Sequence, residues 1–296
     1  MSHPVLAGVD GSRHSLAAAD WAAREAALRG AALTLVHVAP SLPGASPPGP
    51  AARTLRDVGE RMLRHAVADV SGRYPDIEVR GEQADGAPEA ALTSAARGAG
   101  LLVVGTRGSG GFDGLAVGSV ALGVAAAAPC PVVLVPGRSA GAPGGGTSTA
   151  PGDAQVVVGF DAHRSAGEVA DFAFSAARAR GAPLRAVQAW ALPAESVSPR
   201  TLFVTEEDRA TWEDQEVLEL SDALRGWREK YPAVTVRTDV VLLHPAQALL
   251  NASRRACLLV MGSRTGPGTA DGRLGPVTHA VLHHAPCPVA VVPYAG

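Results

Sequence analysis

The second half of this 296-residue sequence repeats three motifs of the first half in the same order. The matching pairs are VLAGVD at 5–10 with VVVGFD at 156–161, LLVVGTR at 101–107 with LLVMGSR at 258–264, and APCPV at 128–132 with APCPV at 285–289. Three matches in one order indicate a duplicated domain. The chain length fits two domains of about 150 residues each.

The segment between the two copies differs from both of them in composition. Residues 137–154 are rich in Gly, Ser, Pro and Ala and have almost no apolar periodicity, which predicts a flexible surface linker. We therefore expect a first domain at 1–137, a linker at 138–154 and a second domain at 155–296.

Within each copy, short β-branched apolar segments alternate with longer helical segments. The strands expected in the first copy are 5–9, 33–38, 77–82, 101–105 and 131–135, and the helices are 15–28, 54–74, 88–97 and 119–127. Continuous apolar strands indicate a parallel sheet buried on both faces, and the alternation requires right-handed crossovers. The sequence predicts an α/β fold of two tandem doubly wound (Rossmann-like) domains, each with a five-stranded mainly parallel sheet flanked by helices.

The segment expected to be helical at 54–74 has an apolar periodicity that supports this interpretation. Leu55, Val58, Met62 and Ala66 recur at three-to-four spacing, as is typical of an amphipathic helix.

Composition excludes several classes of function. The net charge of −2 provides no basic field for nucleic acid, and no run of about 18 apolar residues suggests a membrane span. The N-terminus has no signal-peptide pattern, so we expect a cytoplasmic protein. Three cysteines without a CxxC pair predict neither a disulfide framework nor a zinc site.

The most informative spacing follows the fourth strand. Gly105-Thr106-Arg107-Gly108 is followed, after nine residues, by Gly118-Ser119 at the start of a helix. Glycines let a ligand approach the backbone, and the free N–H groups of a helix N-terminus suit phosphate. The Ser119 hydroxyl is available as N-cap or as a phosphate donor. A loop that uses glycine only for its turns is the alternative. The position after a strand, the repetition and a partner Asp10 after the first strand favour a phosphate cradle.

Two common phosphate motifs are excluded. A P-loop needs a lysine before its Ser or Thr, and the single lysine of the chain is Lys230. The segment 8–13 reads GVDGSR and lacks the third glycine of the dinucleotide fingerprint, so NAD binding is not expected.

The strand ending in Asp10, the second strand ending in His37-Val38 and the spacing Gly-x2-Gly-x9-Gly-Ser resemble the ATP-binding branch of the universal stress protein family, and the resemblance covers both halves. It implies a bacterial stress-response protein that binds ATP or a related adenine nucleotide, with or without Mg²⁺. It also implies pairing through the last strands, 132–135 and 289–292, either between the two halves or between two chains.

The resemblance further implies where the nucleotide lies. Asp10 and the Val38 backbone would lie near the adenine and ribose, the first glycine loop beside the ribose and phosphates, and the helix start at the phosphates. The expected nucleotide-binding residues are Gly8, Val9, Asp10, Val38, Val104, Gly105, Arg107, Gly108, Gly118, Ser119 and Val120.

The second copy departs from this pattern. Thr265 stands where the first copy has Gly108, and Gly275-Pro276 replaces Gly118-Ser119. Proline lacks the N–H, and the hydroxyl is lost as well, so a weakened or empty second site is expected. Retention remains the alternative, because Asp161 is kept and nearby glycines could let the loop rearrange. The candidate residues of this second site are Asp161, Gly262, Arg264 and Gly275.

Some of these residues also have simpler interpretations. Asp10 could instead cap the following helix, and Arg107 and Arg264 could be solvated surface residues. His279 and His283 have metal-ligand spacing, yet no carboxylate or cysteine completes a set, so no metal site is expected. The Pro-rich loop at 40–50 could fold over a bound nucleotide.

The expected function is therefore regulatory ATP binding with no catalytic residue. Slow ATP hydrolysis is the enzyme alternative, in which Asp10 holds Mg²⁺ or orients water. The absence of a lysine and of an evident base beside the loop counts against it. A structural paralogue that binds no nucleotide is the third hypothesis.

Overall fold

The computed structural model describes residues 3–39, 50–109, 116–137, 155–164, 166–191, 205–265 and 274–295. The predicted linker at 138–154 lies outside these residues, as do residues 40–49 of the Pro-rich loop and 266–273 of the second glycine loop.

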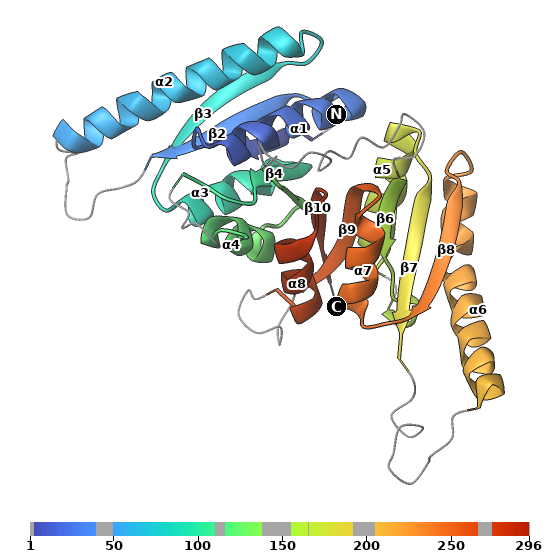
Figure 1. The fold of residues 1–296 in the computed structure, drawn as a ribbon. Coiled ribbons are helices and arrows are strands. Elements are labelled where there is room, and N and C mark those ends of the chain that lie inside the picture. The colour runs from blue at the N-terminus through green and yellow to red at the C-terminus, as the bar shows by residue number, and fades with distance from the viewer. Residues whose placement is uncertain are drawn as a thin grey trace.

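Ten strands form one sheet in the order β3-β2-β1-β4-β5-β10-β9-β6-β7-β8 (Figure 1). The first copy contributes β1 (Val5–Gly8), β2 (Leu33–Ala39), β3 (Val79–Asp85), β4 (Leu101–Gly105) and β5 (Val132–Val135). The second copy contributes β6 (Gln155–Gly159), β7 (Leu184–Trp190), β8 (Val236–Leu242), β9 (Ala256–Thr265) and β10 (Val289–Ala295). Every strand pair within a copy is parallel. Between the copies β5 and β10 are antiparallel, with Ala290 opposite Val133.

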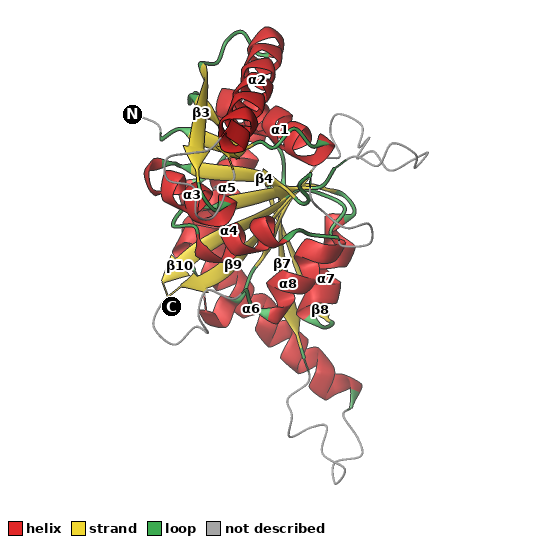
Figure 2. Cartoon of the chain, turned by 90° about the vertical axis from the view of Figure 1, so that its left-hand side faces the viewer, coloured by secondary structure: helices red, strands yellow, loops and turns green. Residues whose placement is uncertain are grey.

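Helices cover both faces of the sheet (Figure 2). One face is covered by α1 (Arg13–Arg29), α2 (Pro50–Arg73), α5 (Gly167–Arg180) and α6 (Glu206–Lys230). The other face is covered by α3 (Pro88–Ala95), α4 (Ser119–Ala127), α7 (Pro245–Ser253) and α8 (Pro276–His284). Two short 3-10 turns, η1 (Ala96–Gly98) and η2 (Ala162–Arg164), complete the described elements. The predicted α/β fold of two tandem doubly wound domains is confirmed.

The central strands are buried on both faces, as their continuous apolar sequences predicted. Leu101 and Val103 of β4 belong to the core under α1 and α2, and Leu102 and Val104 belong to the core under α3 and α4. The four side chains are at most 5% exposed. This double burial places the carboxyl ends of the strands, and the loops that follow them, at one edge of the sheet.

Element boundaries agree best in the middle of the sheet. The observed β4 and α4 have the predicted bounds. The predicted strand at 77–82 is instead β3 at Val79–Asp85, because this edge strand extends through polar residues that have solvent on one side. Helix α2 begins at Pro50, earlier than predicted, since proline is tolerated in the first turn of a helix.

The apolar face of α2 is only partly buried. Leu55 is 43% and Val58 is 48% exposed, whereas Leu63, Ala66 and Val70 are buried. At about 1.5 Å per residue, a 24-residue helix is about 36 Å long, but a seven-residue strand spans only about 23 Å. The first turns of α2 therefore extend beyond the strands that would bury them.

Helices α1 and α5 meet where the two copies join. The Arg29 guanidinium lies 5.2 Å from the centroid of the Phe172 ring, and Arg180 lies 5.7 Å from that of Trp21. Glu25, which is 1% exposed, forms an ion pair with Arg29 at 2.7 Å and another with Arg180 of the other copy. The junction therefore has two symmetric cation–π contacts and one buried carboxylate shared by two arginines.

These contacts follow from the repeat itself. Helices α1 and α5 both end at a glycine in the left-handed conformation, Gly30 and Gly181, each with φ of 58°. Arg29 and Arg180 immediately precede these glycines and so occupy equivalent positions. Glu25 has no such counterpart, because the equivalent position on α5 is Ala176.

Among the described residues, no helix combines the length and the apolar character that crossing a bilayer would require.

Candidate functional site

Asp10 joins the two loops that leave β1 and β4 in the first copy. These strands are neighbours in the sheet, so their carboxyl ends lie side by side. Asp10 Oδ1 accepts a hydrogen bond from the Ser12 N–H at 3.0 Å, and Oδ2 accepts one from the Ser109 N–H at 2.6 Å. The side chain thus connects the start of α1 to the first glycine loop.

The protonation state of Asp10 follows from these contacts. Burial raises the pKa of the carboxyl group, but hydrogen bonds from Ser12, Ser109 and Ser15 outweigh burial and hold the pKa below its ordinary value. Asp10 does not cap α1, so that interpretation is wrong. The N-cap is Ser12, whose Oγ accepts from the Ser15 N–H at 3.2 Å.

At two glycines of the loop, a side chain would collide with neighbouring protein atoms. A Cβ on Gly105 would lie 2.6 Å from the backbone carbon of His14, and a Cβ on Gly108 would lie 2.7 Å from Asp10 Oδ2. Real Cβ atoms do not approach other atoms this closely. Close packing within the protein is therefore sufficient to explain both glycines.

Gly118 differs from them. A Cβ there would meet nothing closer than the Thr106 carbonyl oxygen at 3.7 Å, and the φ of −82° is allowed for any residue. Gly118 is the N-cap of α4, and in the part of the chain that the structure describes no side-chain cap of this helix start is recorded. Ser119 is the first helical residue and is exposed, so its expected role as N-cap is wrong and only that of a donor remains. The amino end of α4 thus has backbone N–H groups without a side-chain cap.

The remaining predicted residues of the first copy surround this helix start or lie behind it. Gly8 ends β1 and Val9 follows it, and the Val9 carbonyl oxygen accepts from His37 Nδ1 at 2.9 Å. Val38 lies near the end of β2, the neighbour of β1 on its other side. The others sit at the end of β4 or in the first turn of α4, with Val104 buried and Arg107 and Val120 half-buried.

His14 is a residue that the sequence reasoning missed. Gly105 and Gly137 both leave room for it, since a Cβ on either would collide with His14 atoms. Burial lowers the pKa of its imidazole, and the charges of Arg107 and Arg13 lower it further. Nothing in the sequence pattern distinguishes His14 from any other residue in the first turn of a helix.

In the second copy the same edge of the sheet encloses a cavity of about 1110 Å³. All four candidate residues of the second site line this cavity, namely Asp161, Gly262, Arg264 and Gly275. Gly275 is the N-cap of α8, with Pro276 following as the first helical residue. The structure therefore brings the predicted second-site residues together around one space large enough for a small molecule.

Two side chains of β7 that were not predicted also line the cavity. Trp190 is 6% exposed, and within the described part of the chain its buried indole N–H has no hydrogen-bond partner. Gln188 is 2% exposed and accepts from the Ala162 N–H at 3.2 Å while donating to a carboxylate oxygen of Glu216. A polar residue in a buried strand was the available sequence signal for Gln188.

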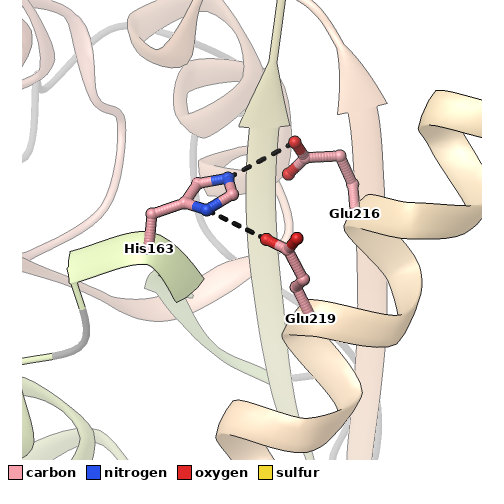
Figure 3. A group of neighbouring side chains, drawn as sticks. All are labelled: His163, Glu216 and Glu219. Atoms are coloured by element: carbon pink, nitrogen blue, oxygen red, sulfur yellow. Dashed lines mark hydrogen bonds and ion pairs between the residues drawn. The ribbon is translucent and has the colours of Figure 1, made fainter.

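A group of side chains with metal-ligand chemistry (Figure 3) includes His163 and Glu216 of the cavity lining. It consists of His163 from η2 and of Glu216 and Glu219 from α6, whose donor atoms all lie within 4.8 Å of one another. The sequence pattern predicts no metal site. Glu216 and Glu219 give no signal of one, because glutamates on an acidic helix resemble an ordinary solvated surface.

The histidines and cysteines considered from the sequence lie elsewhere. The ring centroids of His279 and His283 on α8 lie 4.5 Å apart with the rings tilted by 34°, and these residues are not in the group just described. Cys130, Cys257 and Cys287 are free, and burial raises the pKa of Cys130 to about 11 and of Cys287 to about 12.

The sheet and its loops define a class of protein: a duplicated, doubly wound α/β chain with a glycine loop and a helix start at the carboxyl edge of each half. The model of the universal stress protein family matches residues 1–136 and 154–293. The chain belongs to the universal stress protein family.

Individual relatives have the same tandem organisation. The chain is 34% identical to Universal stress protein Rv2005c of Mycobacterium tuberculosis, covering 98% of this chain and 96% of that protein. A universal stress protein of Mycolicibacterium smegmatis is also 34% identical, covering 97% and 96%. Among solved structures, a universal stress protein from Archaeoglobus fulgidus matches with a TM-score of 0.71 at 18% identity over 99% of both chains, which shows the shared fold.

Proposed function

We propose that this chain is an ATP-binding regulator of the bacterial stress response and that its working nucleotide site lies in the first copy. The observation that carries the proposal is the amino end of α4. No described protein atom occupies the place of a Cβ on the N-cap Gly118, and no side chain of the described residues is recorded as a cap of this helix. A helix start of this kind favours an anion through its N–H groups and its dipole.

The proposed binding mode uses the residues that surround this helix start. The phosphates lie at Gly118, Ser119 and Val120, beside Arg107. The adenosine lies against Asp10 and the Val38 backbone. Asp10 supports this arrangement because its carboxylate already ties the glycine loop to the start of α1.

Mg²⁺ fits this site as a partner of the nucleotide more than as a ligand of the protein. Each Asp10 oxygen already accepts a backbone N–H, so this carboxylate is better suited to hold the loops than to hold an ion. Mg²⁺ commonly binds through substrate phosphates and water, and it would screen the phosphate charge here.

We propose binding, and not turnover, as the function of the site. The lowered pKa of Asp10 makes its carboxylate a weak base near neutral pH, which disfavours activation of a water molecule. ATP hydrolysis at a steady rate that Asp10→Asn abolishes would contradict this part of the proposal.

We propose that the second copy binds the triphosphate weakly or not at all. Pro276 is the first residue of α8 and has no N–H to offer, and Thr265 has a Cβ where the first copy has Gly108. The cavity of this copy therefore has the space for a ligand but a poorer phosphate cradle.

Two matched substitutions test the assignment. Gly118→Ala and Gly275→Ala each add one methyl group at a helix N-cap where no described protein atom lies closer than 3.7 Å. We expect Gly118→Ala to weaken ATP binding at least about tenfold in calorimetric titration, which is about 1.4 kcal/mol. We expect Gly275→Ala to leave it unchanged. Equal effects of the two changes, or no effect of Gly118→Ala, would refute the assignment.

We also propose that the two copies pair with each other within one chain, in the cytoplasm. The register of β5 with β10 and the shared Glu25 at the α1–α5 junction support the pairing. Three free cysteines support a reducing compartment.

In the ten-stranded sheet β5 and β10 have a neighbour on each side, so homodimerisation through these strands requires the two copies to separate. We expect light scattering to give the molar mass of a single chain.

A further inference from the structure

We propose that His163, Glu216 and Glu219 form a binding site for a divalent transition-metal ion of the Zn²⁺ class beside the second-copy cavity. The proposal does not rest on ATP binding, because its residues and its test involve no nucleotide.

The geometry of the group is the first reason. His163 Nε2 lies 3.4 Å from Glu216 Oε1, and Nδ1 lies 2.9 Å from Glu219 Oε2 (Figure 3). Ligands about 2.1 Å from a tetrahedral zinc ion are about 3.4 Å apart, so the nitrogen and the Glu216 oxygen already have the required separation. His163 is 57% exposed, which leaves its ring free to turn toward the Glu219 oxygen.

The charge and the donor set of the group are the second reason. Two carboxylates facing one imidazole carry an excess of negative charge that a divalent cation would neutralise. Imidazole nitrogen with carboxylate oxygen is a donor set that suits zinc and its neighbours in the first transition row.

The third reason is that a hydrogen bond from a buried side chain fixes the Glu216 carboxylate. Its second oxygen accepts a hydrogen bond from Nε2 of Gln188, which is 2% exposed, and Gln188 Oε1 accepts from the backbone N–H of Ala162. The amide therefore fixes the Glu216 carboxylate relative to the residue just before His163. Supporting partners of this kind orient the ligands in natural metal sites.

The cavity itself gives an independent indication that a ligand enters it. Trp190 lies on the cavity wall, is 6% exposed, and its buried indole N–H has no partner among the residues that the structure describes. A buried donor left unpaired is costly, and a ligand with an acceptor atom would satisfy it. Three protein ligands leave at least one metal position open, and two of those ligands, His163 and Glu216, line this cavity.

The first copy has no counterpart of the three metal-ligand side chains of the second copy. The segments RYP at 73–75 and KYP at 230–232 align the ends of α2 and α6, which places Gly59 opposite Glu216 and Met62 opposite Glu219. Asp10 and Asp161 align in the same way and place Ser12 opposite His163. Glycine and methionine offer no ligand of this kind, so the site was gained or kept in one copy only.

The direct experiment titrates ZnCl₂ into the chelator-treated, nucleotide-free full-length chain in a calorimeter. We expect one Zn²⁺ per chain in the unmodified protein. His163→Ala and Glu219→Gln should each weaken binding about tenfold or more. Both positions are partly exposed, so the metal-free variants should unfold at the temperature of the unmodified protein.

Two control substitutions decide between sites. Asp214→Asn removes the same charge from the same helix at an exposed position outside the group, and it should leave zinc binding unchanged. His279→Gln tests whether zinc binds instead at the neighbouring histidines of α8. The proposal is overturned if the protein shows no saturable zinc binding, if His163→Ala binds normally, or if only His279→Gln abolishes binding.

Discussion

At the scale of single residues, the first-copy site depends on one carboxylate and one glycine. Asp10 receives N–H groups from two loops, and Gly118 leaves the start of α4 open. The sequence predicted that both residues belong to one site, because both lie in segments that follow parallel strands. It could not predict that Gly105 and Gly108 are required by His14 and Asp10, since those contacts arise only when the loops pack together.

Asp10→Asn should lower the free energy of unfolding at pH 7 by about 1 kcal/mol, because hydrogen bonds to a charged acceptor are lost. The folded-state pKa lies below the ordinary value of 3.8, so the stabilisation is present above that value and is lost as the pH falls through the folded-state pKa. Denaturant titrations at several pH values should show the difference between Asp10→Asn and the unmodified protein vanishing in acid. Asp161→Asn is the matched control, and an equal effect there would contradict this account.

The free thiols should react slowly in the native protein. Burial raises the pKa of Cys130 to about 11 and of Cys287 to about 12, so little thiolate exists at pH 8. Alkylation monitored by mass spectrometry should leave Cys130 and Cys287 unmodified until denaturant is added. Rapid modification of either thiol in the native protein would be inconsistent with this burial.

At the scale of elements, the sequence predicted central elements better than outer ones. Strand β4 and helix α4 have the predicted bounds because a fully apolar strand and a Gly-Ser helix start are strong local signals. Edge strand β3 and the start of α2 were misjudged. Periodicity shows which residues share a face of a helix, but only the length of the neighbouring strands decides how much of that face is covered.

Substitutions along α2 should separate its covered and uncovered parts. Leu63→Ala should destabilise the protein by about 2–5 kcal/mol, because Leu63 is buried and its loss leaves a cavity. Leu55→Ala removes the same atoms from a side chain that is 43% exposed, and it should cost less than about 1 kcal/mol. Chemical denaturation measures both values. Similar losses for the two variants would mean that the whole apolar face of α2 is buried in solution.

At the scale of the whole molecule, the repeat is symmetric in fold and asymmetric in chemistry. The cation–π contacts of Arg29 and Arg180 are related by the repeat, but Glu25 exists in the first copy only. Two second copies placed together would bring two arginines together without that carboxylate. This favours a first copy paired with a second copy, as one tandem chain provides.

Glu25→Ala should therefore destabilise the protein strongly. It leaves Arg29 and Arg180 facing each other without their buried partner, and breaking such a pair costs about 3–5 kcal/mol. Glu60→Ala removes an exposed ion pair with Arg64 and should cost less than about 1 kcal/mol. Thermal unfolding of the two variants compares them directly. A Glu25→Ala protein as stable as Glu60→Ala would argue against the junction described here.

The same asymmetry separates the two ligand sites. It is measured directly as the number of ATP molecules bound per chain, obtained by equilibrium dialysis with Mg²⁺ present. At a nucleotide concentration about ten times the Kd of the unmodified protein, we predict about one ATP per chain, and about half an ATP or less for Gly118→Ala. Two ATP molecules of similar affinity per chain, or one that survives Gly118→Ala and is lost in Gly275→Ala, would contradict this asymmetry.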